Sequence, residues 1–275
     1  MQGKLFRKAI VTLVVFTCFF LSSRAHVLAW GQIGSGLWLQ DFNLSGNRIG
    51  DDSQVLVLKI DPEIYDLKLL SASEHNTGSM TPQEWADKFD LLAVINASMY
   101  QVNHITSTGY MRNFAHANNP KINPKFGAFL VFNPVDDSVP RVQIVDKYHQ
   151  RWVRLLHQYH TVIQNYRMIS VKQENLWPKT DKQHNIGCIA MDNDGKILFI
   201  HSKKAYSVHA FNQILLSLPI NIYNAMFVEG GSEASLYVNI KKLSTERPEF
   251  DIDWSRYDLS HDLSAIPNVI GVIRR

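Results

Sequence analysis

Cysteine is scarce in this sequence of 275 residues, which contains only Cys18 and Cys188. Cys18 lies in an uncharged apolar run, residues 9–21, that follows three basic residues and is too short for a comfortable membrane span. Such a run is typical of a secretory signal peptide, for which residues 23–25, Ser-Arg-Ala, form a suitable cleavage site. Cleavage would leave Cys188 alone, so no intramolecular disulfide could form and the core would have to supply the stability.

We therefore predict three parts of the chain. Residues 1–25 are a signal peptide or an uncleaved membrane anchor, residues 26–52 are an N-terminal extension, and residues 53–275 are one folded domain. The expected location is the periplasm or the outside of the cell, with contact to a membrane only through an uncleaved N-terminal segment.

The sequence also lacks an excess of charge of one sign. Its 28 Lys and Arg residues nearly balance its 25 Asp and Glu residues, and the formal net charge is +3. Domains that bind nucleic acid usually carry a clear basic excess, so we expect no nucleic acid partner. The sequence has no internal repeat, low-complexity tract or heptad pattern, and its 45% hydrophobic residues suffice for a sizeable core.

Hydrophobic patterning predicts an α+β fold, namely a single domain with a mixed, largely antiparallel sheet and a few packed helices. Strands are expected at residues 54–60, 64–70, 91–95, 126–132, 186–191, 197–201, 225–228, 235–238 and 268–273. We expect the first two to pair as a hairpin, and residues 186–191 to pair with 197–201. Helices are predicted at residues 82–89, after a capping box begun by Thr81, and at residues 208–218, capped by Ser207.

Two segments do not follow one periodicity. Residues 101–125 are polar and rich in Asn and His, which predicts a long surface loop of the kind that often serves as a functional lid. Residues 152–166 combine an apolar helical face with β-branched residues, so helix and strand both remain open there.

The most informative stretch is residues 225–238, in which an apolar strand stops at Glu229, Gly230, Gly231 and Ser232 before a second apolar run begins. Glycines permit backbone conformations closed to other residues and let a ligand approach the main chain. A carboxylate beside exposed amides at the end of a strand is therefore a candidate site. The alternative, which an isolated Gly-Gly pair favours, is a tight turn with a solvated Glu229.

Four motifs follow one another along the chain. They are Asn-Ala-Ser-Met-Tyr at residues 96–100 after a buried strand, the hairpin that begins with Ile186 and Gly187, the helix after it, and Glu-Gly-Gly-Ser at residues 229–232. In this order they resemble the phosphodiester glycosidase family, most of all a bacterial secreted branch related to exopolysaccharide. The resemblance extends from about residue 91 to the C-terminus. It implies a phosphodiester glycosidase-like domain over residues 53–275 and a hydrolase that cleaves a glycosidic or sugar 1-phosphodiester bond in envelope or extracellular glycans.

Some positions differ from the usual pattern of that family. Members typically carry Asp-Gly-Gly-Gly-Ser where this chain has Glu229, so the carboxylate is kept with one more methylene. They often carry an Arg shortly before the Ile-Gly of the hairpin, where this chain has Gln183 and His184. Arg167, which aligns with a family segment near the site, is our candidate for the missing positive charge.

The resemblance implies a catalytic role for Glu229, Asn96 and Arg167. Glu229 would activate water or stabilise the positive anomeric carbon, Arg167 would clamp the phosphate, and Asn96 would bind sugar hydroxyls or the phosphate. Glu233 is a candidate partner of Glu229. The expected substrate-binding residues are Gly230, Gly231, Ser232, Tyr100 and Gln164.

Several alternatives remain open. Arg167 would also fit an ordinary surface ion pair, and Asn96 would also fit a strand end at which it only satisfies backbone groups. His184, His201 and His209 match no standard ligand spacing, so we expect no metal site. No cofactor is evident, and a divalent cation is left as an open alternative.

The expected partner is a carbohydrate or a sugar-phosphate substrate. Instead of an enzyme, the chain could be a non-catalytic carbohydrate-binding protein or an exopolysaccharide assembly factor. A glycosidase that needs no phosphate in its substrate is a third hypothesis. These hypotheses differ in whether a product is released and whether it carries phosphate.

Overall fold

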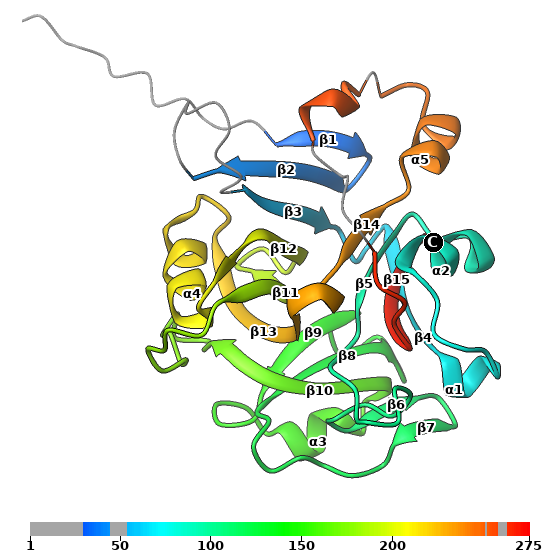
Figure 1. Cartoon of the computed structure of the whole chain (residues 1–275). Helices are drawn as coiled ribbons and strands as arrows, with labels where there is room; N and C mark the ends of the chain where they lie inside the picture. Colours follow the sequence, from blue (N-terminus) through cyan, green and yellow to red (C-terminus); the bar gives the residue numbers. More distant parts are fainter. Residues whose placement is uncertain (1–29, 45–53, 251, 258–262) are drawn as a thin grey trace, which may run out of the picture.

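The computed structural model describes residues 30–44, 54–250, 252–257 and 263–275 (Figure 1). The predicted signal peptide, residues 1–25, and its Cys18 lie outside these residues. Within the described part, no helix combines the length and the apolar character that crossing a bilayer requires. Two antiparallel sheets make up most of the fold, and helices cover them.

The larger sheet has eleven strands in the described part of the chain. Its main path runs through β1 (Gly31–Gly34), β2 (Leu37–Asn43), β3 (Gln54–Ile60), β12 (Ile197–Tyr206), β11 (His184–Asp192), β13 (Ile222–Gly230), β10 (Tyr159–Ile169), β6 (Met111–Asn113) and β7 (His116–Asn119). Two further strands branch from β10, because β8 (Ala128–Pro134) pairs with both β10 and β9 (Val142–Asp146). β1 and β2, from the predicted N-terminal extension, thus belong to the same sheet as β3.

The smaller sheet has four strands in the order β14 (Leu236–Val238), β5 (Ala93–Asn96), β15 (Asn268–Arg274) and β4 (Tyr65–Ser71). Its inner face packs against the larger sheet. One cluster of buried side chains joins Leu56 and Leu58 of β3 with Leu67 of β4 and Ile95 of β5. Removal of this apolar surface from water is the main force that holds the two sheets together.

Helices cover the outer faces of both sheets. α4 (Val208–Ser217) packs Phe211 and Leu215 against the larger sheet, and α2 (Pro82–Phe89) packs Trp85 against the smaller one. Figure 1 shows these two helices on opposite sides of the molecule. The other described helical elements are α1 (Ala72–His75), α3 (Trp152–Leu156), α5 (Ile240–Glu246) and the 3₁₀ turns η1 (Gly231–Glu233) and η2 (Trp254–Arg256). The predicted α+β class with a largely antiparallel sheet is confirmed.

Both predicted helices form, and their caps explain why. The Thr81 hydroxyl accepts from the Glu84 backbone N–H at 3.2 Å, and the Glu84 carboxylate accepts from the Thr81 N–H at 2.8 Å, which completes the capping box. The Ser207 hydroxyl accepts from the Ala210 N–H at 3.3 Å at the start of α4. The hairpin of β11 and β12 is also confirmed.

The predicted hairpin of residues 54–60 with 64–70 is wrong. β3 pairs on both sides, with β2 and β12, whereas β4 pairs with β15 in the smaller sheet. The turn between them, closed by a 3.0 Å bond from the Tyr65 N–H to the Asp61 carbonyl, passes the chain from one sheet to the other. Residues 55–58 are fully buried, so β3 needs cover on both faces and neighbours at both edges, which one hairpin partner could not provide.

The long loop predicted over residues 101–125 contains β6 and β7, which extend the larger sheet beside β10. Gln164 of β10 holds this segment. Its side-chain amide accepts from two backbone N–H groups and donates to two backbone carbonyls there, at 2.8 to 3.1 Å. Residues 152–166 form both of the alternatives, first α3 and then the beginning of β10.

Candidate active site

Glu229 lies one residue before the end of β13, in the middle of the larger sheet. Side chains alternate along this strand, so Val228 faces the core between the sheets, whereas Phe227 and Glu229 face the opposite side, where α4 packs. The register of β13 with β11 shifts at this point, between Gly187 and Cys188. A bulge of this kind bends a strand and changes the direction of its side chains, and such bulges are common beside active sites.

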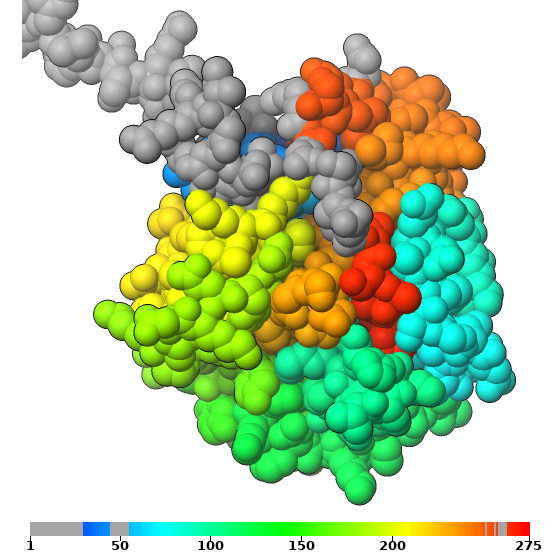
Figure 2. All heavy atoms as spheres, viewed as in Figure 1, coloured from blue at the N-terminus to red at the C-terminus, as the bar shows by residue number. Residues whose placement is uncertain are grey.

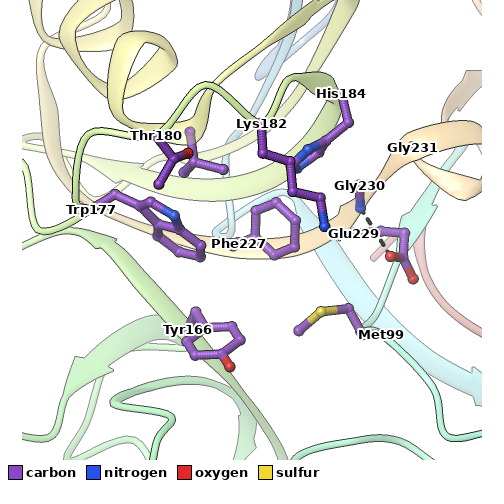
Figure 3. A pocket seen from close by; sticks show the side chains of 11 residues that line it. Met99, Tyr166, Trp177, Thr180, Lys182, His184, Phe227, Glu229, Gly230 and Gly231 are labelled. Carbon is purple, nitrogen blue, oxygen red and sulfur yellow. Dashed lines mark hydrogen bonds between the residues drawn. The ribbon is translucent and has the colours of Figure 1, made fainter.

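A cavity of about 500 Å³ lies on this outer side of the larger sheet and includes Glu229 in its wall. Its other lining residues are Met99, Tyr166, Trp177, Thr180, Lys182, His184, Val208, Phe227, Gly230 and Gly231. Figure 3 shows the rings of Tyr166, Trp177 and Phe227 on one side and the Glu229 carboxylate on the other. On the molecular surface, the orange segment after β13 lies between the yellow-green segment before β11 and the blue-green segment after β5 (Figure 2). Three distant parts of the chain thus meet at this site.

Burial dominates the electrostatics of Glu229. The residue is 8% exposed, and loss of solvation raises the pKa of its carboxyl to about 7. The Gly230 backbone N–H donates to Oε1 at 2.9 Å and acts in the opposite direction, while the charge of Glu233 raises the pKa further. A carboxyl with a pKa in this range is able both to take up and to release a proton near neutral pH.

The geometry explains why both Gly230 and Gly231 lack a side chain. A Cβ on Gly230 would lie 2.4 Å from Cδ2 and 2.7 Å from Nε2 of His184, so the imidazole packs directly on the backbone. Gly231 has a φ of +84°, which residues with a side chain rarely adopt, and it begins the turn η1. The Gly-Gly pair therefore places the His184 ring beside Glu229 and turns the chain away after it.

Two ionisable residues of the cavity were not predicted as site residues from the sequence, Lys182 and His184. Figure 3 shows the Lys182 ammonium group directed toward Glu229 and Gly230. Burial, together with the charge of Lys182, lowers the pKa of His184, which favours the neutral imidazole. The sequence feature that could have identified them is their position just before the Ile-Gly of β11, where members of the family that the sequence resembles often carry an Arg.

Asn96 organises the turn that follows Glu229. Its Nδ2 donates to the Glu233 carbonyl at 2.9 Å, and its Oδ1 accepts from the Ser235 N–H at 2.8 Å and from the Ser235 hydroxyl at 3.2 Å. The side chain is buried, and both of its polar atoms are used by these contacts. These contacts match the alternative in which Asn96, at the end of a strand, satisfies backbone groups. A direct catalytic role of Asn96 stays a prediction.

Tyr100 and Ser232 lie close to the carboxylates. Burial raises the pKa of the Tyr100 hydroxyl, and the negative charges of Glu233 and Glu229 raise it further, which places Tyr100 near both. Ser232 is exposed on η1 and its hydroxyl donates to Glu233 Oε2 at 3.3 Å. These residues, with Gly230 and Gly231, form the part of the predicted site that the fold brings together around Glu229.

Arg167 and Gln164 do not line the cavity of Glu229. Gln164 is fully buried and binds the backbone of the segment around β6. Arg167 lines a neighbouring cavity, and its Nη2 donates to Asp146 Oδ2 at 2.7 Å. Arg167 therefore forms an ion pair, but with a buried carboxylate rather than at the surface as the alternative had it, and its role toward a phosphate stays a prediction.

The three histidines considered as metal ligands lie in different elements. His184 begins β11, His201 lies in β12, and His209 lies in α4, where its Nδ1 is 2.6 Å from the Trp177 carbonyl. In the part of the chain that the structure describes, no group of three or more His, Cys, Asp or Glu side chains is arranged to hold a metal ion.

A buried carboxyl of raised pKa, in a cavity that a lysine and three aromatic rings also line, is a candidate for acid–base catalysis. The model of the phosphodiester glycosidase family matches residues 89–273, more than half of the chain. The chain belongs to the phosphodiester glycosidase family.

Solved structures share this fold at low sequence identity. A hypothetical protein from Synechocystis is similar with a TM-score of 0.55 and 14% identity over 87% of this chain, which spans 62% of that protein. The catalytic domain of zebrafish N-acetylglucosamine-1-phosphodiester alpha-N-acetylglucosaminidase, auto-inhibited by pro-peptide, has a TM-score of 0.53 and 12% identity over 90% of this chain and 87% of that one. A Burkholderia pseudomallei protein described as exported has a TM-score of 0.50 and 8% identity over 80% of this chain and 74% of that one. A search of curated proteins gave no match.

Proposed function

We propose that this protein is an exported hydrolase that cleaves a sugar 1-phosphodiester bond in envelope or extracellular glycans. The observation that carries the proposal is the carboxyl of Glu229, whose pKa of about 7 and position in a cavity that Lys182 also lines suit acid–base catalysis. Membership of the phosphodiester glycosidase family supports the class of bond. The N-terminal sequence pattern supports export.

Glu229 acts as the general base in this proposal. Its ionised carboxylate takes a proton from a water molecule as the water oxygen bonds to the anomeric carbon. The bond between that carbon and the phosphate oxygen breaks, and the phosphate leaves with the bonding electrons. The products are a free sugar and a phosphate monoester.

Lys182 stabilises the departing phosphate. A phosphate monoester is a weakly basic leaving group, so it needs a nearby positive charge more than it needs a proton. The ammonium group of Lys182 faces the same part of the cavity as Glu229 (Figure 3). The backbone N–H groups of Gly231 and Ser232, at the turn η1, add hydrogen-bond donors for the phosphate oxygens.

The aromatic side of the cavity holds the sugar ring. Tyr166, Trp177 and Phe227 present rings against which the C–H faces of a sugar can pack. Asn96 acts indirectly. It holds the backbone of Glu233 and Ser235 and thereby the position of η1 beside Glu229.

The test uses the purified protein and the methyl diester of N-acetylglucosamine 1-phosphate in water enriched in heavy oxygen, with mass spectrometry of the products. We expect a free sugar that carries the heavy oxygen and methyl phosphate that does not. Heavy oxygen in the phosphate would show attack at phosphorus and contradict the role of Glu229 at the anomeric carbon. If the wild type released no product from a panel of sugar 1-phosphodiesters, with and without chelator, the proposed function would be wrong.

A further inference from the structure

A second cavity, of about 480 Å³, lies beside the one that contains Glu229. Tyr166 and Trp177 line both cavities. The other residues of the second cavity are Lys125, Gly127, Tyr148, Arg167, Leu176 and Pro178. Its volume is within the range of about 300–1,000 Å³ that is usual for small-molecule sites.

Tyr166 and Trp177 form the common wall of the two cavities and belong to a row of packed aromatic rings. The ring centroids of Phe126 and Tyr166 are 4.1 Å apart, those of Tyr166 and Trp177 are 5.4 Å apart, and those of Trp177 and Phe227 are 5.5 Å apart. Phe227 lines the cavity of Glu229, so the row leads from one cavity to the other. Packing of this kind holds the Tyr166 and Trp177 rings in place between the two cavities.

The second cavity is lined by cations and, among its described residues, by no carboxylate. Arg167 is held in place, because its Nη2 donates to the buried Asp146 at 2.7 Å and its guanidinium lies 4.7 Å from the centre of the Tyr148 ring. Lys125 adds a second positive charge. Asp146 offsets the charge of Arg167, so Lys125 supplies the net positive charge; together with the guanidinium N–H donors and a solvent-facing aromatic ring, it suits an anionic group attached to a sugar.

Gly127 shows that this arrangement is closely packed. A Cβ at this position would lie 2.6 Å from Cδ of Arg167 and 2.7 Å from Cε2 of Tyr148. The absence of a side chain therefore lets the arginine and the tyrosine lie directly on the backbone before β8. Tyr148 remains 63% exposed, so its outer face is open to a ligand.

We propose that the second cavity binds the next unit of an anionic, phosphate-linked glycan chain, with Arg167 and Lys125 on its phosphate and Tyr148 against its sugar ring. The inference rests on the proposed function, because the unit in the first cavity is the one that is cleaved. The substrate is then a polymer of at least two phosphate-linked units, and a single sugar 1-phosphodiester fills only half of the site.

The test compares a substrate of one unit with a longer one. The probes are the methyl diester of N-acetylglucosamine 1-phosphate and a synthetic tetramer of N-acetylglucosamine joined by phosphodiester bonds. We expect kcat/KM for the tetramer to exceed that for the single unit, and Tyr148→Ala or Lys125→Ala to reduce this ratio about tenfold, the size expected for the loss of one good contact. Lys121→Ala is the matched control, since Lys121 is exposed on the same segment but lines neither cavity. A ratio that is near one in the wild type, or that neither substitution changes, would overturn the proposal.

Binding measurements separate this inference from the proposed function. Titration calorimetry on the Glu229→Gln variant gives the affinity for both probes without turnover. If the wild type cleaves neither probe but the tetramer still binds about tenfold more tightly, and Tyr148→Ala removes that difference, the second cavity is a glycan site and only the catalytic proposal fails. Equal affinity for the two probes would overturn the inference whether or not the protein is a hydrolase.

Discussion

Replacing Glu229 by Gln should stabilise the folded protein above neutral pH and leave it unchanged in acid. Burial raises the pKa of this carboxyl from 4.5 to about 7, so the folded protein resists an ionisation that the unfolded chain undergoes freely. At about 1.4 kcal/mol per pKa unit, this costs about 3 kcal/mol once the solution is above pH 7. Gln has nearly the same shape, stays neutral, and its carbonyl oxygen can still accept from the Gly230 N–H.

The sign of the effect follows from the two pKa values. Below pH 4.5 the carboxyl is protonated in both states and makes no difference to stability. Between pH 4.5 and about 7 it ionises in the unfolded chain first, so the wild type loses stability as the pH rises, and above about pH 7 the loss is complete. The advantage of Glu229→Gln should therefore grow from near zero in acid to a maximum of about 3 kcal/mol, less any cost of burying the amide.

The assay is urea unfolding of the wild type and the variant over a series of pH values on both sides of this window. Glu249→Gln is the control, because Glu249 is 55% exposed and pairs only at 3.5 Å with Arg247. A Glu229→Gln variant that was equally or less stable than the wild type at alkaline pH would refute the claim that burying the ionised carboxylate lowers the free energy of unfolding. The same variant should lose activity by about 10²–10⁴-fold, the usual contribution of a general acid or base.

Three further predictions concern residues around this carboxyl. Gly230→Ala should displace His184 and lower kcat/KM on the order of 100-fold, whereas Gly78→Ala, which meets nothing within 4 Å, should change it little. Asn96→Ala should lower the free energy of unfolding in urea by about 2–3 kcal/mol, because buried backbone groups lose their partners. Burial raises the pKa of the Cys188 thiol, so a thiol reagent at neutral pH should modify it only after the protein is unfolded.

A specific result would contradict each of these three predictions. Full activity of Gly230→Ala would show that the imidazole is free to move without consequence for the chemistry. Unchanged unfolding of Asn96→Ala would mean that water replaces its bonds to η1 without cost. Rapid labelling of Cys188 in the native protein would show that β11 opens far more readily than its central place in the larger sheet suggests.

Local interactions explain what could be predicted along the chain. The capping box joins Thr81 and Glu84, which are only three residues apart, so the beginning of α2 can be predicted from a short stretch of sequence. The alternation and apolar runs that mark β11, β12 and β13 are likewise local. The long segment before β8 was harder, because β6 and β7 are short and Gln164 of a distant strand binds the backbone on either side of them.

The sequence by itself determined where most strands and helices lie, that a carboxylate and two glycines end β13, and to which family the chain belongs. Only the tertiary structure decided that β3 and β4 lie in different sheets, that Arg167 lines a second cavity, and that Lys182 and His184 line the same cavity as Glu229. The reason is physical. Caps and periodicity depend on neighbours within a few residues, whereas burial, pKa and the shape of a cavity depend on segments that are far apart in the chain and meet only when it folds.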